Sequence, residues 1–220
     1  MNARVTPGFV AVNAAFLWLA TVIAATALWP IYRSAALVVL IAVALVTGSL
    51  IAILGAVFRW PSPVMLLASA LVFLVIGVPL AVPSKALFGI LPTPAGLLDL
   101  IAGVALGWKQ LVTITLPVGD YEALLVPALV LVFGSTTIGL TVALRLRYGE
   151  AGVLAPVVVF VAAIAFGPQF PERPVPTAIA LLVAVLFWLV WFQWHRRRRA
   201  IRLLAVASAG AGPVARPESG

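Results

Sequence analysis

Long apolar runs without a charged side chain limit how this chain can fold more than any other feature. Several windows of about 18 residues or more have no charge, and a helix of about 20 such residues crosses a hydrocarbon core of roughly 30 Å. Hydrophobic residues make up 64% of the chain and charged residues only 9%, whereas about 25% is typical of soluble domains. The sequence therefore predicts an all-α integral membrane protein in a lipid bilayer.

Six crossings are predicted, in a membrane domain of residues 1–202 that is followed by a flexible tail over 203–220. The predicted spans are residues 9–28, 34–58, 64–82, 123–144, 152–166 and 177–194. The first span has an apolar run longer than the 7 to 15 residues of a signal-peptide core. We therefore expect an uncleaved helix, with a cleaved signal peptide as the alternative.

Small residues and prolines add detail to these spans. A stripe of Gly48, Ser49, Ala52 and Gly55 in the second span, spaced by roughly one helical turn, predicts close packing against a neighbouring helix. Pro79 lies in the last turns of the third span, so this helix is expected to kink there or to end early.

Basic residues set the predicted orientation, because cytoplasmic loops are enriched in lysine and arginine. With six spans, one side of the membrane receives Arg4, Arg59, Arg145, Arg147, Arg196, Arg197, Arg198, Arg199, Arg202 and Arg216. The other side receives only Arg33, Lys85, Lys109 and Arg173. Both termini are therefore predicted to be cytoplasmic, in a multi-pass membrane protein. The net charge of +8 is assigned to orientation and not to nucleic acid, because these residues punctuate apolar runs instead of clustering on a soluble face.

The outer loop over residues 83–122 is long enough to contain structure of its own. Thr93 can cap a helix whose first residue is Pro94, so an amphipathic helix is predicted over residues 94–111 on the outer face of the membrane. Its expected apolar face contains Leu97, Ile101, Val104, Trp108 and Leu111, and its more polar face contains Asp99, Gly103, Leu106 and Gln110. The alternative is a seventh crossing from about Ala95 to Val118, which would bury Lys109 and Gln110.

The stretch GILPTPAGLLDL, from Gly89 to Leu100, follows three apolar spans and precedes further spans and an arginine run. This layout and its LPTP element resemble the N-terminal membrane domain of bacterial transglutaminase-like proteins, notably the actinobacterial ones. The resemblance implies that a further crossing and an extracytoplasmic catalytic domain follow the membrane block. That chemistry needs a cysteine nucleophile, a histidine base and an aspartate, whereas this chain has no cysteine and a single histidine, His195. The resemblance therefore assigns no activity to any residue here.

No other catalytic, metal or cofactor site is predicted, because a lone histidine and scattered carboxylates form no ligand cluster. The chain is expected to be a non-catalytic anchor or scaffold that presents its outer loop to a transglutaminase-like domain, in the same polypeptide or in another. The candidate partner-docking residues are Leu91, Pro92, Thr93, Pro94 and Asp99. The candidate membrane-surface anchor consists of Arg196, Arg197, Arg198, Arg199 and Arg202.

A small-molecule or lipid transporter is the alternative function. The hydroxyl cluster Ser135, Thr136, Thr137 and Thr141 in the fourth span would then line a path together with the Pro79 kink. The simpler expectation is that each hydroxyl donates to the backbone carbonyl four residues earlier. The predicted spans contain no ionisable residue, which argues against an ion-coupled machine.

Overall fold

The structure is a computed structural model that describes residues 7–89, 91–113, 122–146, 148–167 and 174–210. Six of its helices are long and apolar enough to cross a membrane, which confirms the predicted all-α membrane fold. The helices of these spans are α1 (Pro7–Thr26), α3 (Ala35–Val57), α4 (Ser62–Ala81), α6 (Val126–Arg145), α7 (Leu154–Phe166, preceded by the 3-10 turn η3 at Gly149–Val153) and α8 (Pro174–Gly210). The remaining elements are α2 (Trp29–Tyr32), η1 (Pro83–Lys85), β1 (Ala86–Leu87), β2 (Leu91–Pro92), α5 (Pro94–Thr113) and η2 (Glu122–Leu125).

Helix α6 is the central element of the bundle. It packs against α1, α3, α4, α5 and α7, and 67% of its membrane window is buried, compared with 22% for α4. The small-residue stripe of α3 lies in this contact region, and all four of its residues are buried, as predicted. A Cβ atom on Gly48 would lie 2.9 Å from the Thr137 hydroxyl oxygen, so the absence of a side chain allows α3 to approach α6 closely.

Two prolines inside the spans are accommodated near helix ends. Pro79 lies inside α4, which ends two residues later at Ala81, one residue before the end of the predicted span. Pro156 is the third residue of α7. A proline costs little there because the first amide groups of a helix have no intrahelical acceptor.

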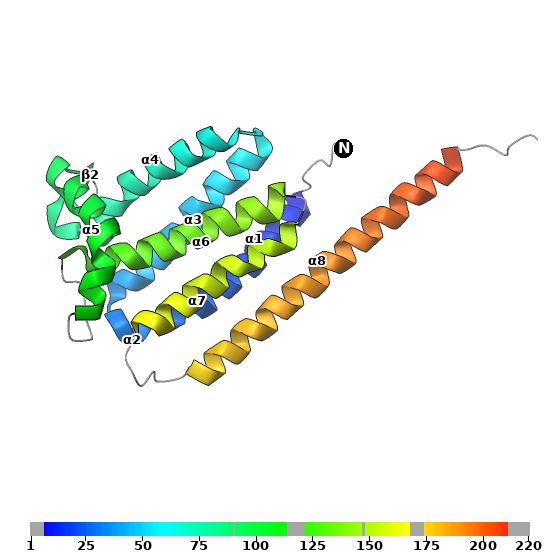
Figure 1. The fold of residues 1–220 in the computed structure, drawn as a ribbon. Helices are drawn as coiled ribbons and strands as arrows, with labels where there is room; N and C mark the ends of the chain where they lie inside the picture. Colours follow the sequence, from blue (N-terminus) through cyan, green and yellow to red (C-terminus); the bar gives the residue numbers. More distant parts are fainter. Residues whose placement is uncertain (1–6, 90, 114–121, 147, 168–173, 211–220) are drawn as a thin grey trace, which may run out of the picture.

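Helix α8 is longer than the sequence analysis predicted. The last span was expected to end at residue 194 and a flexible tail to begin at 203, but the helix continues without a break to Gly210. Leucine, alanine and arginine, which are strong helix formers, dominate residues 196–207, and the next proline is Pro213. Residues 203–210 of the expected tail are thus helical, and residues 211–220 lie outside the described part. At about 1.5 Å per residue, the 37-residue helix is about 55 Å long, and it extends beyond the other helices (Figure 1).

The helix ends group as six crossings require. The start of α1, the turn between α3 and α4 and the end of α6 lie at one end of the bundle, and α2 and α5 lie at the other (Figure 1). Two contacts hold the first end together: the Arg145 guanidinium donates to the Trp60 carbonyl, and the Phe9 ring stacks on His195 with centroids 5.2 Å apart. We call the end of the bundle that contains these contacts the arginine end. We call the opposite end the cap end, because α5 lies across it.

Candidate functional site

The LPTP segment forms a small folded unit at the cap end. Strand β1 pairs antiparallel with β2, with Leu87 opposite Leu91, so Leu91 and Pro92 belong to a hairpin. Phe88 and Gly89 form its turn with φ values of 53° and 72°. A left-handed backbone is easy for glycine but unfavourable for a bulky residue such as phenylalanine. The Phe88 side chain at this turn is exposed.

Thr93 connects this hairpin to α5, and its predicted role as a helix cap is confirmed. Its hydroxyl oxygen accepts a hydrogen bond from the Gly96 amide at 3.1 Å, and its hydroxyl group donates to the Lys85 carbonyl at 2.5 Å. Pro94 is the first residue of α5, as predicted. The Thr93 hydroxyl thus caps the start of α5 and also bonds the backbone at the base of the hairpin.

The face of α5 that packs on the bundle is lined by glycines and leucines. Ile101 and Val104, which belong to the predicted apolar face, are exposed, whereas the buried positions are Gly96, Leu100, Gly103, Gly107 and Leu111. A Cβ atom on Gly96 would lie 2.6 Å from a Val78 methyl group, and one on Gly107 would lie 2.9 Å from Pro127. The glycines let α5 lie directly on α4 and α6, so close backbone approach contributes to the inner face together with the buried Leu100 and Leu111.

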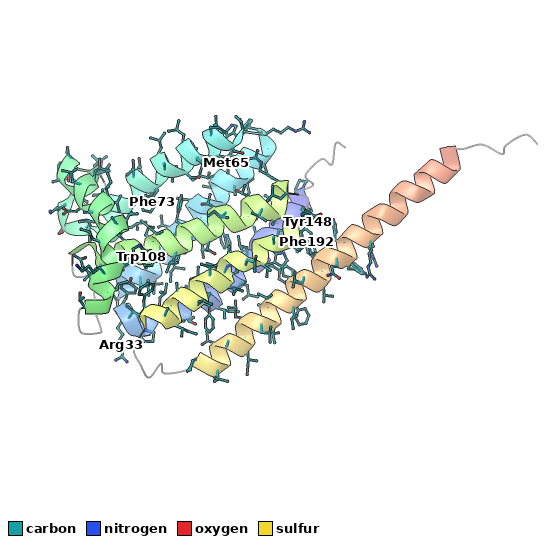
Figure 2. The ribbon with its side chains drawn as sticks, in the orientation of Figure 1. Arg33, Met65, Phe73, Trp108, Tyr148 and Phe192 are labelled. Carbon is teal, nitrogen blue, oxygen red and sulfur yellow. The ribbon has the colours of Figure 1, made fainter. Side chains whose placement is uncertain are left out.

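The second half of α5 reaches α7. Trp108 lies between α5 and the bundle (Figure 2), and its ring centroid is 5.3 Å from that of Phe166. Helix α5 is not among the six helices suited to crossing a membrane, and it crosses the end of the bundle instead of running along the spans (Figure 1). The alternative of a seventh crossing over residues 95–118 is therefore not supported.

Asp99 forms an ion pair with Lys85, which the sequence analysis did not predict. With Ser84 and Gln110, these two residues line a cavity of about 340 Å³ between the base of the hairpin and α5. Both charged side chains are partly exposed, and such pairs contribute only about 0 to 1 kcal/mol. Asp99 therefore helps to seat α5 and is not a free docking group.

Large apolar side chains are exposed on both the hairpin and α5. We call this set the outer face: Leu87, Phe88, Leu91, Leu98, Ile101 and Leu106. Phe88 is 89% exposed and Leu98 is 70% exposed. Of the predicted docking residues, only Leu91 belongs to this face. Ile101 was expected on the apolar face of the helix and Leu106 on its more polar face.

A buried tyrosine, Tyr32, joins two elements at the cap end. The Tyr32 hydroxyl donates to the Leu124 carbonyl at 3.1 Å, which joins α2 to η2. Burial raises the pKa of Tyr32 above its ordinary value, and a hydrogen bond with the Ala128 backbone opposes this shift. The phenol therefore stays protonated and remains a hydrogen-bond donor.

At the arginine end, the predicted anchor residues lie on the continuous helix α8. The Arg198 guanidinium carbon lies 3.6 Å from the ring centroid of Trp194, a cation–π contact at the end of the span. His195 stacks on Phe9 and on Trp191, each at 5.2 Å. Arg197 is exposed, and the side chains of Arg196, Arg199 and Arg202 lie outside the described part.

Polar side chains inside the bundle join its helices. The Trp188 indole nitrogen donates to the Asn13 side-chain oxygen at 3.0 Å, and the Trp18 indole nitrogen donates to the Ser49 hydroxyl at 2.7 Å. These bonds tie α1 to α8 and to α3. The lone amide of Asn13 in an apolar span was a sequence signal for such a contact, because polar groups in a membrane need a partner.

The hydroxyl cluster of α6 only partly follows the expected pattern. Thr136 donates to the Val132 carbonyl at 2.7 Å, as predicted. Ser135, Thr137 and Thr141 instead have buried hydroxyl oxygens that lack a hydrogen-bond partner. Close packing against α3 provides one reason, because Gly48 brings that helix directly onto Thr137.

Within the described residues, no group of three or more histidine, cysteine, aspartate or glutamate side chains could hold a metal ion. His195 lies at the arginine end, where it stacks on Phe9, whereas Asp99 lies on α5 at the cap end. The exposed apolar outer face makes the cap the candidate functional surface. No protein-family model matches the sequence, and neither the curated proteins nor the solved structures give a match.

Proposed function

We propose that the chain is a non-catalytic membrane scaffold that holds the cap at the membrane surface as a docking site for an extramembrane protein domain. The observation that carries this proposal is the outer face: apolar side chains are exposed on a helix that lies across the end of the bundle. On the spans, equally exposed residues such as Leu66 are covered by lipid. Under this proposal the outer face lies in water, where a bound partner would cover it.

Apolar surface exposed to water is unfavourable by about 25 cal/mol per Å². Contiguous apolar patches on a surface commonly mark interaction sites. The inner face of α5 already packs against the bundle through its glycines and the buried Leu100. The outer face is therefore available to a partner without disturbing the packing of α5 on the bundle.

The arginine end supplies the anchor. Each basic side chain near an anionic leaflet contributes about 1 kcal/mol, and the predicted orientation places this end in the cytoplasm of a bacterial cell. The cap then faces the extracytoplasmic side. The resemblance of Gly89–Leu100 to transglutaminase-like proteins supplies one candidate partner, a transglutaminase-like domain in the same polypeptide or in another.

Site-specific photocrosslinking in native membranes tests the proposal. A photoreactive phenylalanine analogue replaces Phe88 on the outer face or, as a matched control, Leu66 on the lipid-facing side of α4. We expect a discrete protein adduct from position 88 and only lipid adducts from position 66. The double variant Leu98→Ser and Ile101→Ser should lose the adduct, and identification of the adduct tests the resemblance. Lipid adducts alone at position 88 would contradict a docking role.

Transport of a small molecule is the second candidate function, favoured by the unpaired hydroxyls of Ser135, Thr137 and Thr141. Alanine at all three positions should leave membrane insertion and the cap crosslink unchanged under the scaffold proposal. Loss of a growth or uptake phenotype, with normal insertion, would favour transport.

A further inference from the structure

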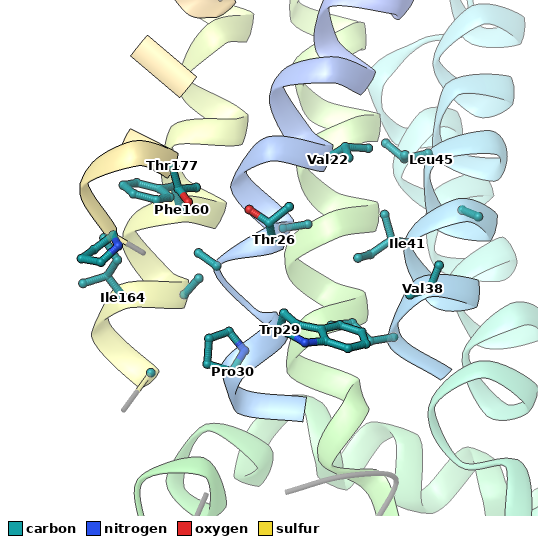
Figure 3. A pocket seen from close by; sticks show the side chains of 17 residues that line it. Val22, Thr26, Trp29, Pro30, Val38, Ile41, Leu45, Phe160, Ile164 and Thr177 are labelled. Carbon is teal, nitrogen blue, oxygen red and sulfur yellow. The ribbon is translucent and has the colours of Figure 1, made fainter. Parts of the chain in front are cut away.

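A second hollow of the molecule lies within the membrane-spanning part, near the cap end. It has a volume of about 720 Å³ and is bounded by α1, α3, α7 and the start of α8 (Figure 3). Its walls are mainly aliphatic, with Val22, Val38, Ile41 and Leu45 on one side and Ile164 on another. We call this hollow the crevice.

Small residues create the crevice. Alanine occupies several wall positions, where a larger side chain would take up part of the space: Ala25, Ala27, Ala42 and Ala163. The crevice is open to its surroundings, since Val22, Val38 and Ile164 on its walls are exposed. Its volume lies in the range of 300–1,000 Å³ typical of ligand sites, so a molecule from the surroundings can occupy it.

The depth of the crevice restricts it to one leaflet. Its wall on α3 runs from Leu37 to Leu45, which at about 1.5 Å per residue is about 12 Å. This is less than half of a hydrocarbon core of roughly 30 Å. Trp29 and Pro30 lie at its cap-facing end (Figure 3), and tryptophan is characteristic of the level of lipid headgroups.

We infer that the crevice binds one acyl chain of a phospholipid from the leaflet at the cap end. The lining is apolar, and hydrocarbon chains surround the spans at this depth, so a lipid chain is the occupant whose chemistry matches. A transmembrane helix of a partner is about 10 Å wide and would extend through both leaflets, whereas the crevice ends within one. The headgroup lies beside Trp29, and the chain runs toward Leu45. This inference is independent of the proposed docking function of the cap.

Filling the crevice tests the inference. Ala42→Phe places a ring into it from α3, and Ile164→Phe does so from α7; Ala70→Phe, at an exposed position of α4, is the matched control. The full chain is reconstituted into vesicles of phosphatidylcholine and phosphatidylglycerol, extracted in mild detergent and examined by native mass spectrometry. We expect one retained phospholipid per chain in the wild type and in Ala70→Phe. Its occupancy should fall about ten-fold or more in a filled variant.

Thermal unfolding gives a second readout, because a ligand that binds the folded state raises the melting temperature by mass action. Added phospholipid should stabilise the wild type and Ala70→Phe more than the filled variants. Equal retention and equal stabilisation in all variants would overturn the inference, because the lipid would then be bound elsewhere.

A measurement on the unfilled crevice keeps the test independent of how the filled variants fold. Phosphatidylcholine brominated in its chains should quench Trp29 fluorescence after excess lipid is removed, measured as the difference between the wild type and Trp29→Phe. The absence of a quenched Trp29 component would also overturn the inference.

Discussion

Replacing Asn13 with alanine should weaken the attachment of α8 to α1. Asn13 is 0% exposed and Trp188 is 2% exposed, and the indole nitrogen donates to the Asn13 side-chain oxygen at 3.0 Å. In the variant, this N–H group remains buried without an acceptor. The Phe9 carbonyl also loses the side-chain donor that it receives at 2.8 Å.

The size of this effect follows from two limits. A buried donor without a partner costs about 1–3 kcal/mol, whereas hydrogen bonds between helices in a membrane contribute about 0.6 kcal/mol on average and about 1.7 kcal/mol at most. We therefore expect a loss of about 1–2 kcal/mol in the free energy of unfolding. This loss corresponds to a 5- to 30-fold change in the folded-to-unfolded ratio.

A double-mutant cycle isolates the hydrogen bond from the loss of side-chain volume. Asn13→Ala, Trp188→Phe and the double variant are unfolded in mixed detergent micelles and followed by circular dichroism. We expect a coupling energy of about 0.6–1.7 kcal/mol. The control cycle pairs Asn13→Ala with Trp18→Phe, whose indole binds Ser49 instead, and should be additive. A coupling below about 0.3 kcal/mol for the Trp188 cycle would refute the reasoning.

Three further predictions concern the cap and the arginine end. Thr93→Ala should destabilise α5 by about 0.5–2 kcal/mol through loss of the helix cap, and Asp99→Asn should destabilise it by less than about 1 kcal/mol because the ion pair is partly exposed. Hydrogen exchange of the α5 amides measures both losses. A larger loss for Asp99→Asn than for Thr93→Ala would contradict the assignment of Thr93 as the cap. Gly107→Val should displace α5 from Pro127, since even a Cβ atom would lie 2.9 Å from that ring. If the α5 amides keep their protection from hydrogen exchange, the residues assigned to the inner face are wrong. Replacing the four arginines at 196–199 with glutamine should increase the fraction of chains inserted with the opposite orientation. A reporter cysteine near the C-terminus measures this fraction. An unchanged orientation would show that other residues determine it.

The sequence predicted the crossings well because each depends on a local property, the length of an apolar run. The start of α5 was equally local, since Thr93 and Pro94 carry a capping signal in adjacent positions. The small-residue stripe on α3 also needed only spacing. These features require no knowledge of which helices are neighbours.

The features that were missed depend on such neighbours. The inner face of α5 depends partly on the close approach of Gly96 and Gly107 to other helices, and a hydrophobicity pattern rates glycine as a poor candidate for a buried face. Lys85 and Asp99 meet only because Thr93 fixes the hairpin against α5. The crevice likewise arises from small residues on helices distant in the sequence, so no single segment predicts it.

Water exposure of the outer face tests the central claim most directly, and the absence of cysteine from the chain makes this measurement clean. Leu98→Cys and Leu66→Cys, which replace residues that are 70% and 73% exposed, are reconstituted as purified chains in phospholipid vesicles. Each is treated with a membrane-impermeant maleimide after the vesicles have been made permeable to it. We predict rapid labelling of Leu98→Cys and little labelling of Leu66→Cys. If both remain unlabelled until the vesicles are dissolved, the outer face lies in lipid and the docking account is wrong.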